Sequence, residues 1–371
     1  MTELEFIGIT ATQRVDTSAA TGGPAGMATH TEIGVPVGPP VNKEFAAELA
    51  RAHEASGFDR VLIAHSSASI DGFVLADQTL EATDELKVLL AHRPGFWAPT
   101  IAARAYATLD ALHPGRVAMH VITGGDDADQ QRDGDYLTKQ ERYRRTDDFL
   151  TVLRKEWESE TPFDHDGEFY KVTGAHASVR PPLGRIPIYF GGASEDAVRV
   201  GGKHADAYAF WGEPLDAIRQ RIAEVRAAAA PYGRDPRFSV SLRPIVAETE
   251  EEAWAKAEAI LAAAQAKSGA NGPLSGFGKN AVGSQRLVAI AEQGDVHDKR
   301  LWTALAKVTG GAGNSTSLVG TYEQVAEGLL DYVDLGVTTL LIRGFDPLED
   351  AKKYGRVIEL VRAGARNRTA A

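Results

Sequence analysis

The sequence predicts an α/β protein in which eight parallel strands, separated by helices, close into one (β/α)8 TIM barrel. Short apolar runs alternate with longer helical patterns along most of the chain, and this alternation is typical of a parallel sheet with helical crossovers. About eight such runs occur, a number that favours a closed barrel over an open sheet. The 371 residues, of which 43% are hydrophobic, provide enough apolar mass for a barrel with insertions.

The expected strands are short apolar segments that lie between turns and helices. In chain order they are residues 5–10, 60–65, 86–91, 117–122, 188–190, 207–210, 239–242 and 338–342. Three of the helices between them are clear from their patterns. They are residues 46–56, which end at Gly57, residues 75–81, and residues 100–112, which end at the turn His113-Pro114-Gly115.

Two stretches interrupt the alternation. Residues 14–40 are rich in Thr, Gly and Pro, and they predict a long loop after the first strand. Residues 268–317 are rich in Gly, Asn and Ser, with helical segments at 284–292 and 301–306, and they lie between strands seven and eight. Insertions of this length are typical of lids, binding loops or disordered segments. With no tandem repeat and no dividing linker, we expect one domain over residues 1–371 with a lid at about 268–317.

Composition excludes several classes of function. The formal net charge of −11 argues against a nucleic-acid or anionic-membrane partner, because phosphate binding needs a basic face. The absence of cysteine removes disulfides, thiolate metal sites and cysteine nucleophiles. Asp164-His165-Asp166 has metal-binding side chains, but we expect a solvated hairpin turn there and no metal site. With no apolar stretch of ~20 residues and an acidic start, the sequence indicates a cytoplasmic enzyme.

The end of the fifth strand has the pattern of an anion-binding turn. In barrels, ligands bind where strands end and the following loops begin. Here Gly191, Gly192, Ala193 and Ser194 stand between a strand and a predicted helix, so that backbone N–H groups, the helix dipole and a hydroxyl converge. A tight turn capped by Ser194 without any ligand fits the pattern equally well.

An ordered set of motifs resembles a known family. The set comprises Thr123-Gly124-Gly125-Asp126, Glu141-Arg142-Tyr143, the Tyr-Phe-Gly-Gly-Ala-Ser run at 189–194, and Trp211-Gly212-Glu213-Pro214. In this order and spacing it resembles the FMNH₂-dependent alkanesulfonate monooxygenases of the bacterial luciferase-like family over nearly the whole chain. The resemblance implies that Gly191, Gly192, Ala193, Ser194 and Tyr143 contact the FMN phosphate. It also implies that His120 and Thr123 lie along the flavin.

The residues expected around the substrate depart from that family. Ser69 is expected where the family has a cysteine, Arg243 follows Ser241-Leu242 where it has Arg-x-His, and Phe345-Asp346-Pro347 replaces Tyr-x-His. Thr309 stands where the family has an arginine in the lid. Thr12 or Gln13 stands near the place of a histidine that the family has after the first strand. These changes indicate a different substrate, or a sulfonate that is recognised by different residues.

Four residues are candidates for substrate binding and chemistry. Arg243 and Arg343 are expected at the ends of strands seven and eight, where guanidinium groups can bind an oxyanion, although each can instead form a salt bridge with a neighbouring loop. Trp211 is expected to wall the pocket or to pack in the core. His65, His92 and His120 fall at strand ends, and His65 is the one expected to take part in the chemistry.

The resemblance implies a two-component monooxygenase that uses O₂ and reduced FMN on a small organic substrate, such as an alkanesulfonate or a related organosulfur compound. No Gly-x-Gly-x-x-Gly turn is present, so we expect a separate NAD(P)H:flavin reductase to supply the reduced FMN. A homodimer or homotetramer is expected. The alternatives are a non-catalytic flavin-binding relative and an F420-dependent oxidoreductase. A phosphate-binding aldolase or isomerase is disfavoured, because those barrels place the phosphate after strands seven and eight.

Overall fold

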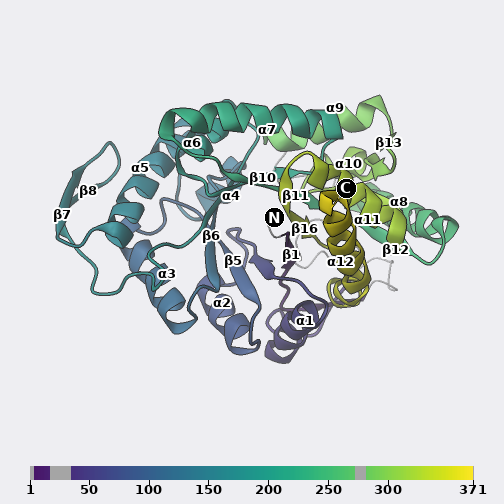
Figure 1. Ribbon diagram of the computed structural model, residues 1–371, viewed down its shortest axis with the longest axis horizontal. Coiled ribbons are helices and arrows are strands. Elements are labelled where there is room, and N and C mark those ends of the chain that lie inside the picture. The colour runs from purple at the N-terminus through teal and green to yellow at the C-terminus, as the bar shows by residue number, and fades with distance from the viewer. Residues whose placement is uncertain (1–3, 17–34, 272–280, 371) are drawn as a thin grey trace. The chain divides into compact units, whose positions relative to one another are not determined.

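The computed structural model describes residues 4–16, 35–271 and 281–370. Eight parallel strands form a closed barrel in the order β1-β16-β11-β10-β9-β6-β5-β4, which confirms the (β/α)8 prediction and all eight expected strands (Figure 1). The strands are β1 (Glu5–Ile9), β4 (Arg60–Ile63), β5 (Lys87–His92), β6 (Val117–Val121), β9 (Ile188–Gly191), β10 (Ala207–Trp211), β11 (Arg237–Leu242) and β16 (Val337–Ile342).

The chain groups into two compact units, and each is described by itself. The first unit comprises Met1–Val61, Ala209–Ala223 and Arg237–Ala371, and the second comprises Leu62–Tyr208 and Glu224–Pro236. Strands β4 and β10 and helix α7 (Leu215–Ala229) contain residues of both. One domain with a lid stays a prediction. Among the described residues, no helix has both the length and the apolarity that a membrane span needs.

In the second unit, β5, β6 and β9 are paired in parallel, so that Ala91, His120 and Tyr189 form one row across them. The helices of this unit are α2 (Gly72–Glu81), α3 (Pro99–Leu112), α4 (Asp127–Arg132), α5 (Lys139–Glu158) and α6 (Glu195–His204). The predicted helices at 75–81 and 100–112 are therefore confirmed. The capping box at Thr138 begins α5: Thr138 Oγ1 accepts a hydrogen bond from Glu141 N, and the Glu141 carboxylate accepts one from Thr138 N at 2.8 Å.

The metal-binding residue types at 164–166 lie in a strand and not in a turn. Strands β7 (Phe163–Asp166) and β8 (Lys171–Ala175) form an antiparallel hairpin, visible beside α5 in Figure 1. His165 Nε2 lies 2.5 Å from Asp148 Oδ1 of α5. The other oxygen of Asp148 accepts the backbone N–H groups of Phe169 and Tyr170 at 2.8 and 2.9 Å. His165 thus braces the hairpin against α5.

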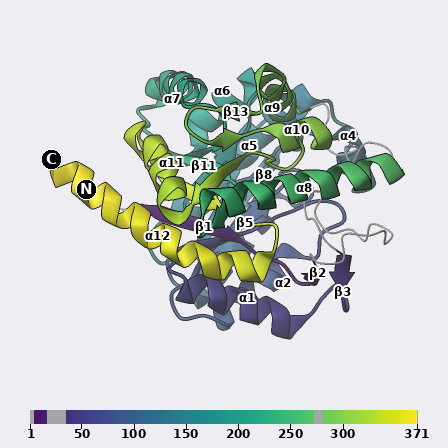
Figure 2. The same cartoon turned by 90° about the vertical axis from the view of Figure 1, so that its right-hand side faces the viewer.

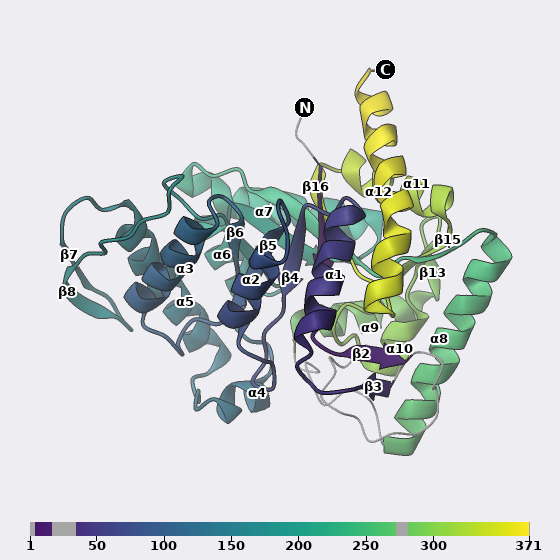
Figure 3. The same cartoon turned by 90° about the horizontal axis from the view of Figure 1, so that it is seen from below.

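In the first unit, α1 (Lys43–Ala55) confirms the helix expected at 46–56. It packs against α12 (Pro347–Ala370) through Phe45, Leu49, Leu348 and Ala351 (Figure 3). Strands β2 (Arg14–Asp16) and β3 (Val35–Val37) pair where a continuous loop was expected at 14–40. Residues 17–34 of that stretch lie outside the described residues.

The chain between β11 and β16 builds a small sheet and several helices, which Figure 2 shows. In this sheet β12 (Ile245–Ala247), β15 (Ser317–Thr321), β14 (Leu301–Trp302) and β13 (Val296–His297) follow one another in this order. Helix α8 (Glu250–Asn271) packs on it through Ala253, Ala257, Trp302 and Val319. The helix expected at 284–292 is α9 (Val282–Gln293), but residues 301–302 form a strand and the helix begins only at Ala304. Residues 272–280 of the predicted lid lie outside the described residues. Two further helices are α10 (Ala304–Thr309) and α11 (Tyr322–Asp334).

Candidate functional site

The turn from β9 into α6 has the geometry of an anion nest. Gly192 has φ +148°, in the region that favours glycine, and a Cβ there would lie 2.5 Å from Ala197 Cβ and 3.3 Å from the Tyr143 hydroxyl. Ser194 caps α6, and its Oγ accepts a hydrogen bond from Ala197 N at 3.3 Å. Gly191, Gly192, Ala193 and Ser194 are all partly exposed, so the turn is accessible. The capped turn is confirmed, and its ligand stays a prediction.

Tyr143 of α5 reaches the same turn. Its hydroxyl is hydrogen-bonded to Ser194, and burial raises the pKa of Tyr143 above its usual value, so the phenol keeps its proton. Tyr208 donates a hydrogen bond to the carbonyl of Gly192 at 3.1 Å. The fold therefore brings together three of the predicted phosphate-binding residues that are far apart in the sequence. We call Tyr143, Gly192 and Ser194 the phosphate cradle.

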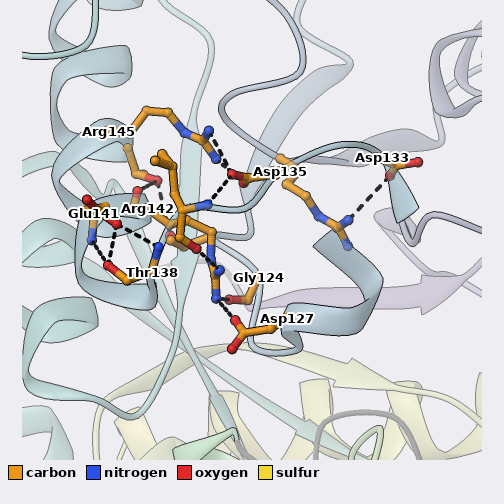
Figure 4. Close-up of polar contacts among 12 residues, drawn as sticks. Gly124, Asp127, Asp133, Asp135, Thr138, Glu141, Arg142 and Arg145 are labelled. Atoms are coloured by element: carbon orange, nitrogen blue, oxygen red, sulfur yellow. Dashed lines mark hydrogen bonds and ion pairs between the residues drawn. The ribbon is translucent and has the colours of Figure 1, made fainter. Parts of the chain in front are cut away.

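Buried ion pairs fix the loops beside α5, as Figure 4 shows. Arg142 is 1% exposed. It donates to Asp127 Oδ1 at 2.6 Å, to the carbonyl of Leu137 at 2.5 Å and to the carbonyl of Gly124 at 3.4 Å. Arg145 pairs with the buried Asp135 at 2.5 Å. These pairs hold the β6–α4 loop and the chain before α5 in one arrangement, because each guanidinium joins α5 to the chain that precedes it.

The loop after β6 is shaped by Gly124 and Gln130. Gly124 has φ +91°, and a Cβ there would overlap the Gln130 amide, so only glycine fits. Gln130 is 1% exposed, and neither polar atom of its side chain has a hydrogen-bond partner among the described residues. The hydroxyl of Thr123 lies 3.3 Å from the hydroxyl of Thr146 in α5. A flavin contact from Thr123 stays a prediction.

A second buried network joins the loops after β4 and β5. Asp129 is 1% exposed. It accepts hydrogen bonds from Ser67 Oγ at 2.5 Å and from Ser67 N at 3.1 Å, and it forms an ion pair with Arg93. Ser69, the residue expected in the place of the family cysteine, accepts a hydrogen bond from Ser66 N at 2.9 Å. Arg93 and Ser67 are thus positioned by α4.

The three histidines at the strand ends are held neutral at neutral pH. Burial lowers the pKa of His120 to about 4 and, with a smaller contribution from His65, lowers that of His92 to about 3. Burial and the nearby Arg93 lower the pKa of His65. The ring of His92 stacks on Phe149 with centroids 5.3 Å apart. His65 Nε2 is buried and has no hydrogen-bond partner within the described ranges.

In the first unit, Trp211 at the end of β10 contacts the first turn of α9. A Cβ on Gly283 would lie 3.1 Å from the Trp211 ring, and Trp211 packs beside Leu287, Ala291 and Ala306. Two residues after it, the buried Glu213 accepts hydrogen bonds from Arg286 Nε at 2.9 Å and from Nη2 at 2.5 Å. Trp211 therefore has a packing role on α9, and its role as a pocket wall stays a prediction.

Arg243 and Arg343 contact one loop from neighbouring strands. Arg243 N donates to the carbonyl of Thr316 at 2.9 Å, and Arg343 Nη2 donates to the carbonyl of Gly313. Arg243 is fully buried, lies over the Phe345 ring at 3.8 Å and donates to the carbonyl of Gly344 at 2.7 Å. The fold thus brings the two predicted arginines to the same loop.

Sequence analysis did not single out Asp129, Gln130 or Asn314. Asn314 is buried with φ +57°, and it donates to Ser241 Oγ of β11 at 2.7 Å. Asp129 and Asn314 contact partners 36 to 73 positions away, which no local pattern can show. The one available signal was the glycine run at 124–125, which indicates that another chain segment approaches the backbone.

Solved structures with this fold include a riboflavin lyase with modified FMN and riboflavin, at 18% identity and TM-score 0.78, covering 100% of this chain and 92% of that one. DmoA from Hyphomicrobium sulfonivorans has 20% identity and TM-score 0.74, with 98% and 88% covered. An F420-dependent secondary alcohol dehydrogenase has 16% identity and TM-score 0.67, with 97% and 99% covered. At these identities the likeness shows the fold.

The family is shown by the sequence itself. The model of the luciferase-like monooxygenases matches residues 24–339, a range that includes the phosphate cradle, both buried networks and Arg243. The family expected from the ordered motifs is confirmed, while the alkanesulfonate branch stays a prediction. The chain belongs to the luciferase-like monooxygenase family, a family of oxidoreductases.

Proposed function

We propose that this chain is a two-component monooxygenase that takes reduced FMN from a separate NAD(P)H:flavin reductase and uses O₂ to oxidise a small organic substrate. The observation that carries the proposal is the phosphate cradle. It combines a glycine backbone, two mutually hydrogen-bonded hydroxyls and the N-terminus of a ten-residue helix. A phosphate monoester is the group that such donors suit best.

The donor set fits FMN. Tyr143 and Ser194 offer hydroxyls to phosphate oxygens, and Gly191, Gly192 and Ala193 offer a backbone that the phosphate can approach closely. His120 and Thr123 are proposed to lie along the flavin ring. Reduced FMN, when bound, supplies the electrons that activate O₂. The protein holds the cofactor, and burial keeps the imidazole of His120 neutral at pH 7, because it lowers the pKa of that group.

His65 is the proposed proton-handling residue. Because its pKa is lowered, the imidazole is neutral at pH 7 and exchanges hydrogen bonds without carrying a charge. Its Nε2 atom has no hydrogen-bond partner among the described residues, and is therefore available to a bound oxygen or substrate atom. The neighbouring network of Arg93 and Asp129 holds the loop that follows β4.

The proposed substrate is an alkanesulfonate or a related organosulfur compound, which is cleaved at its C–S bond. Arg243 and Arg343 are proposed to bind its anionic head, with Trp211 as an apolar wall. The backbone N–H of Arg243 and the guanidinium of Arg343 contact the same loop, so the two residues lie at one place, and guanidinium groups are the planar donors that suit a sulfonate or carboxylate. A homodimer or homotetramer is proposed for the active enzyme.

Flavin titration tests the cofactor assignment. The double variant Ser194→Ala/Tyr143→Phe removes both hydroxyls of the cradle. We expect it to weaken FMN binding by about 2–3 kcal/mol, because two hydrogen bonds to the charged phosphate are lost. The measurement is fluorescence titration with oxidised FMN and anaerobic titration with reduced FMN, which we expect to bind more tightly. Unchanged affinity in the double variant would remove the assignment. A parallel titration with F420 separates the deazaflavin alternative, since the proposal requires FMN to bind more tightly.

A further inference from the structure

Four basic side chains lie in the first two turns of α5, around Tyr143. Three of them are committed to carboxylates: Arg142 to Asp127 at 2.6 Å, Arg144 to Glu168 at 3.1 Å and Arg145 to Asp135 at 2.5 Å. Figure 4 shows two of these pairs. The fourth is Lys139, whose ammonium group makes no hydrogen bond or ion pair with any residue that the structure describes. Lys139 is therefore the basic group here that is available to a ligand.

The position of Lys139 directs it towards the cradle. It is the first residue of α5, and Tyr143 follows one turn later on the same helix face. The carboxylate of Asp196, in the first turn of α6, acts on both: it raises the pKa of Lys139 and that of Tyr143. Since Lys139 shares a helix face with Tyr143 and lies near the carboxylate of Asp196, we expect it beside this turn. Asp127 of α4 is also near Lys139 and raises its pKa. Lys139 is partly buried, and burial with the nearby Arg142 lowers its pKa.

A phosphate in the cradle needs a positive charge nearby, and the residues of the cradle do not provide one. A phosphate monoester carries about −1.5 to −2 charges at pH 7, whereas the cradle itself contains two neutral hydroxyls and a backbone. The first turn of α6 carries Glu195 and Asp196, and Asp196 pairs with Arg199 at 3.2 Å. A dianion placed at this turn is repelled by Glu195, and an ammonium group on the facing helix offsets that repulsion.

We propose that Lys139 binds the phosphate of FMN and makes the site select FMN over riboflavin. The inference rests on the proposed function, since it assumes that the cradle holds a flavin phosphate. An ammonium ion is a compact charge on a flexible stem and binds phosphate without fixed geometry. Lys139 therefore contributes charge recognition, while Tyr143 and Ser194 contribute directed hydrogen bonds.

The test compares the affinities of FMN and riboflavin in matched variants. Lys139→Met keeps the length of the side chain and removes the charge, and Lys139→Arg keeps the charge. The control is Arg144→Met, which removes one charge from an exposed site on the same helix, where the partner is Glu168. Each protein is titrated with oxidised FMN and with riboflavin by fluorescence at low and at high salt, and circular dichroism checks that each variant is folded.

We expect Lys139→Met to lose about 10- to 100-fold in FMN affinity, the effect of one charged contact, with riboflavin affinity unchanged. The salt dependence of FMN binding is expected to weaken in the same variant. Lys139→Arg and Arg144→Met are expected to keep the preference of the natural chain. The inference is overturned if Lys139→Met keeps the full preference for FMN, or if Arg144→Met loses as much. If the natural chain itself binds FMN no better than riboflavin, the cradle assignment fails together with it.

Discussion

The most informative single residue of the proposed substrate site is Arg243, because its guanidinium is fully buried. It lies over the Phe345 ring and donates to the carbonyl of Gly344. A buried cation is costly unless it is surrounded by partners, and an anionic substrate head is a natural additional partner. The same contacts also show that Arg243 supports the local packing. Its removal therefore has to be tested for both roles.

We expect Arg243→Ala to raise KM for alkanesulfonates at least ~10-fold, the loss of one charge-assisted contact, while the affinity for FMN stays the same. The measurement is steady-state turnover over methane- to octanesulfonate with an added flavin reductase. Added guanidinium ion should fill the space left by the side chain and lower KM again in this variant only. A variant that loses folding stability but keeps the natural KM would show that Arg243 is a packing residue.

At the scale of elements, helix α9 is held on the end of β10 by two contacts. The Trp211 ring lies against Gly283, and Arg286 forms a bidentate pair with the buried Glu213. On the other side, Gly311 has φ +69°, and a Cβ there would overlap the backbone of Ser284. The first turn of α9 therefore fits closely between Trp211 and Gly311, with no room for a larger side chain.

We expect Gly283→Val to displace the first turn of α9, because the new side chain meets the Trp211 ring. If α9 excludes water from the reaction, more of the consumed O₂ will be released as hydrogen peroxide. The measurement is peroxide formed per O₂ consumed, with hydrogen exchange of residues 282–293 as the structural readout. Ala289→Val, at an exposed position of the same helix, is the matched control. Equal peroxide yields in both variants, with exchange raised only in Gly283→Val, would show that α9 does not protect the reaction.

The elements that could be predicted from the sequence are those with a local pattern. All eight barrel strands and the helices at 46–56, 75–81, 100–112 and 284–292 follow from apolar runs and periodicity. The small sheet β12-β15-β14-β13 could not be predicted, because its strands have two to five residues. They exist through long-range pairing such as Ile245 with Val319. Long-range pairing also explains why residues 301–302, which were expected to begin a helix, form a strand: Leu301 pairs with Leu318.

At the scale of the whole molecule, the site residues also separate into those with a local sequence pattern and those whose contacts form only in the fold. Ordered motifs predicted the β9–α6 turn and Tyr143, since glycines and a capping serine leave a clear signal. The sequence could not show that Arg142, Arg144 and Arg145 are committed to partners and that Lys139 is not. Ion-pair partners are chosen in space: Arg145 pairs with Asp135 across ten positions, and Arg93 pairs with Asp129 across 36.

The whole fold should lose stability in mild acid because it buries neutral histidines. Burial lowers the pKa of His53, His92 and His120 from 6.5 to about 4, 3 and 4. In the unfolded chain these groups take up protons near pH 6.5, whereas in the folded chain they do so only near pH 3–4. Their contribution to stability is therefore complete above pH 6.5 and is lost progressively as the pH falls through this window. Burial raises the pKa values of Asp59, Asp110 and Glu156, and these groups act in the opposite direction, because they take up protons at a higher pH in the folded chain than in the unfolded chain.

We expect the free energy of unfolding to fall between pH 7.5 and pH 5.0 by about 1–2 kcal/mol for each such histidine, since one pKa unit corresponds to 1.36 kcal/mol. His92→Phe should reduce this loss of unfolding free energy by the contribution of one histidine, because the new side chain takes up no proton. The ring of His92 stacks on Phe149 and meets Tyr106 edge-on at 5.7 Å, an environment that accepts phenylalanine. The measurement is urea unfolding of the natural chain and the variant at both pH values. Leu183→Phe, which adds a phenylalanine at an exposed position, is the control and should leave the pH dependence unchanged. If His92→Phe loses as much stability on acidification as the natural chain, His92 takes up its proton in the folded protein and is not held neutral by burial.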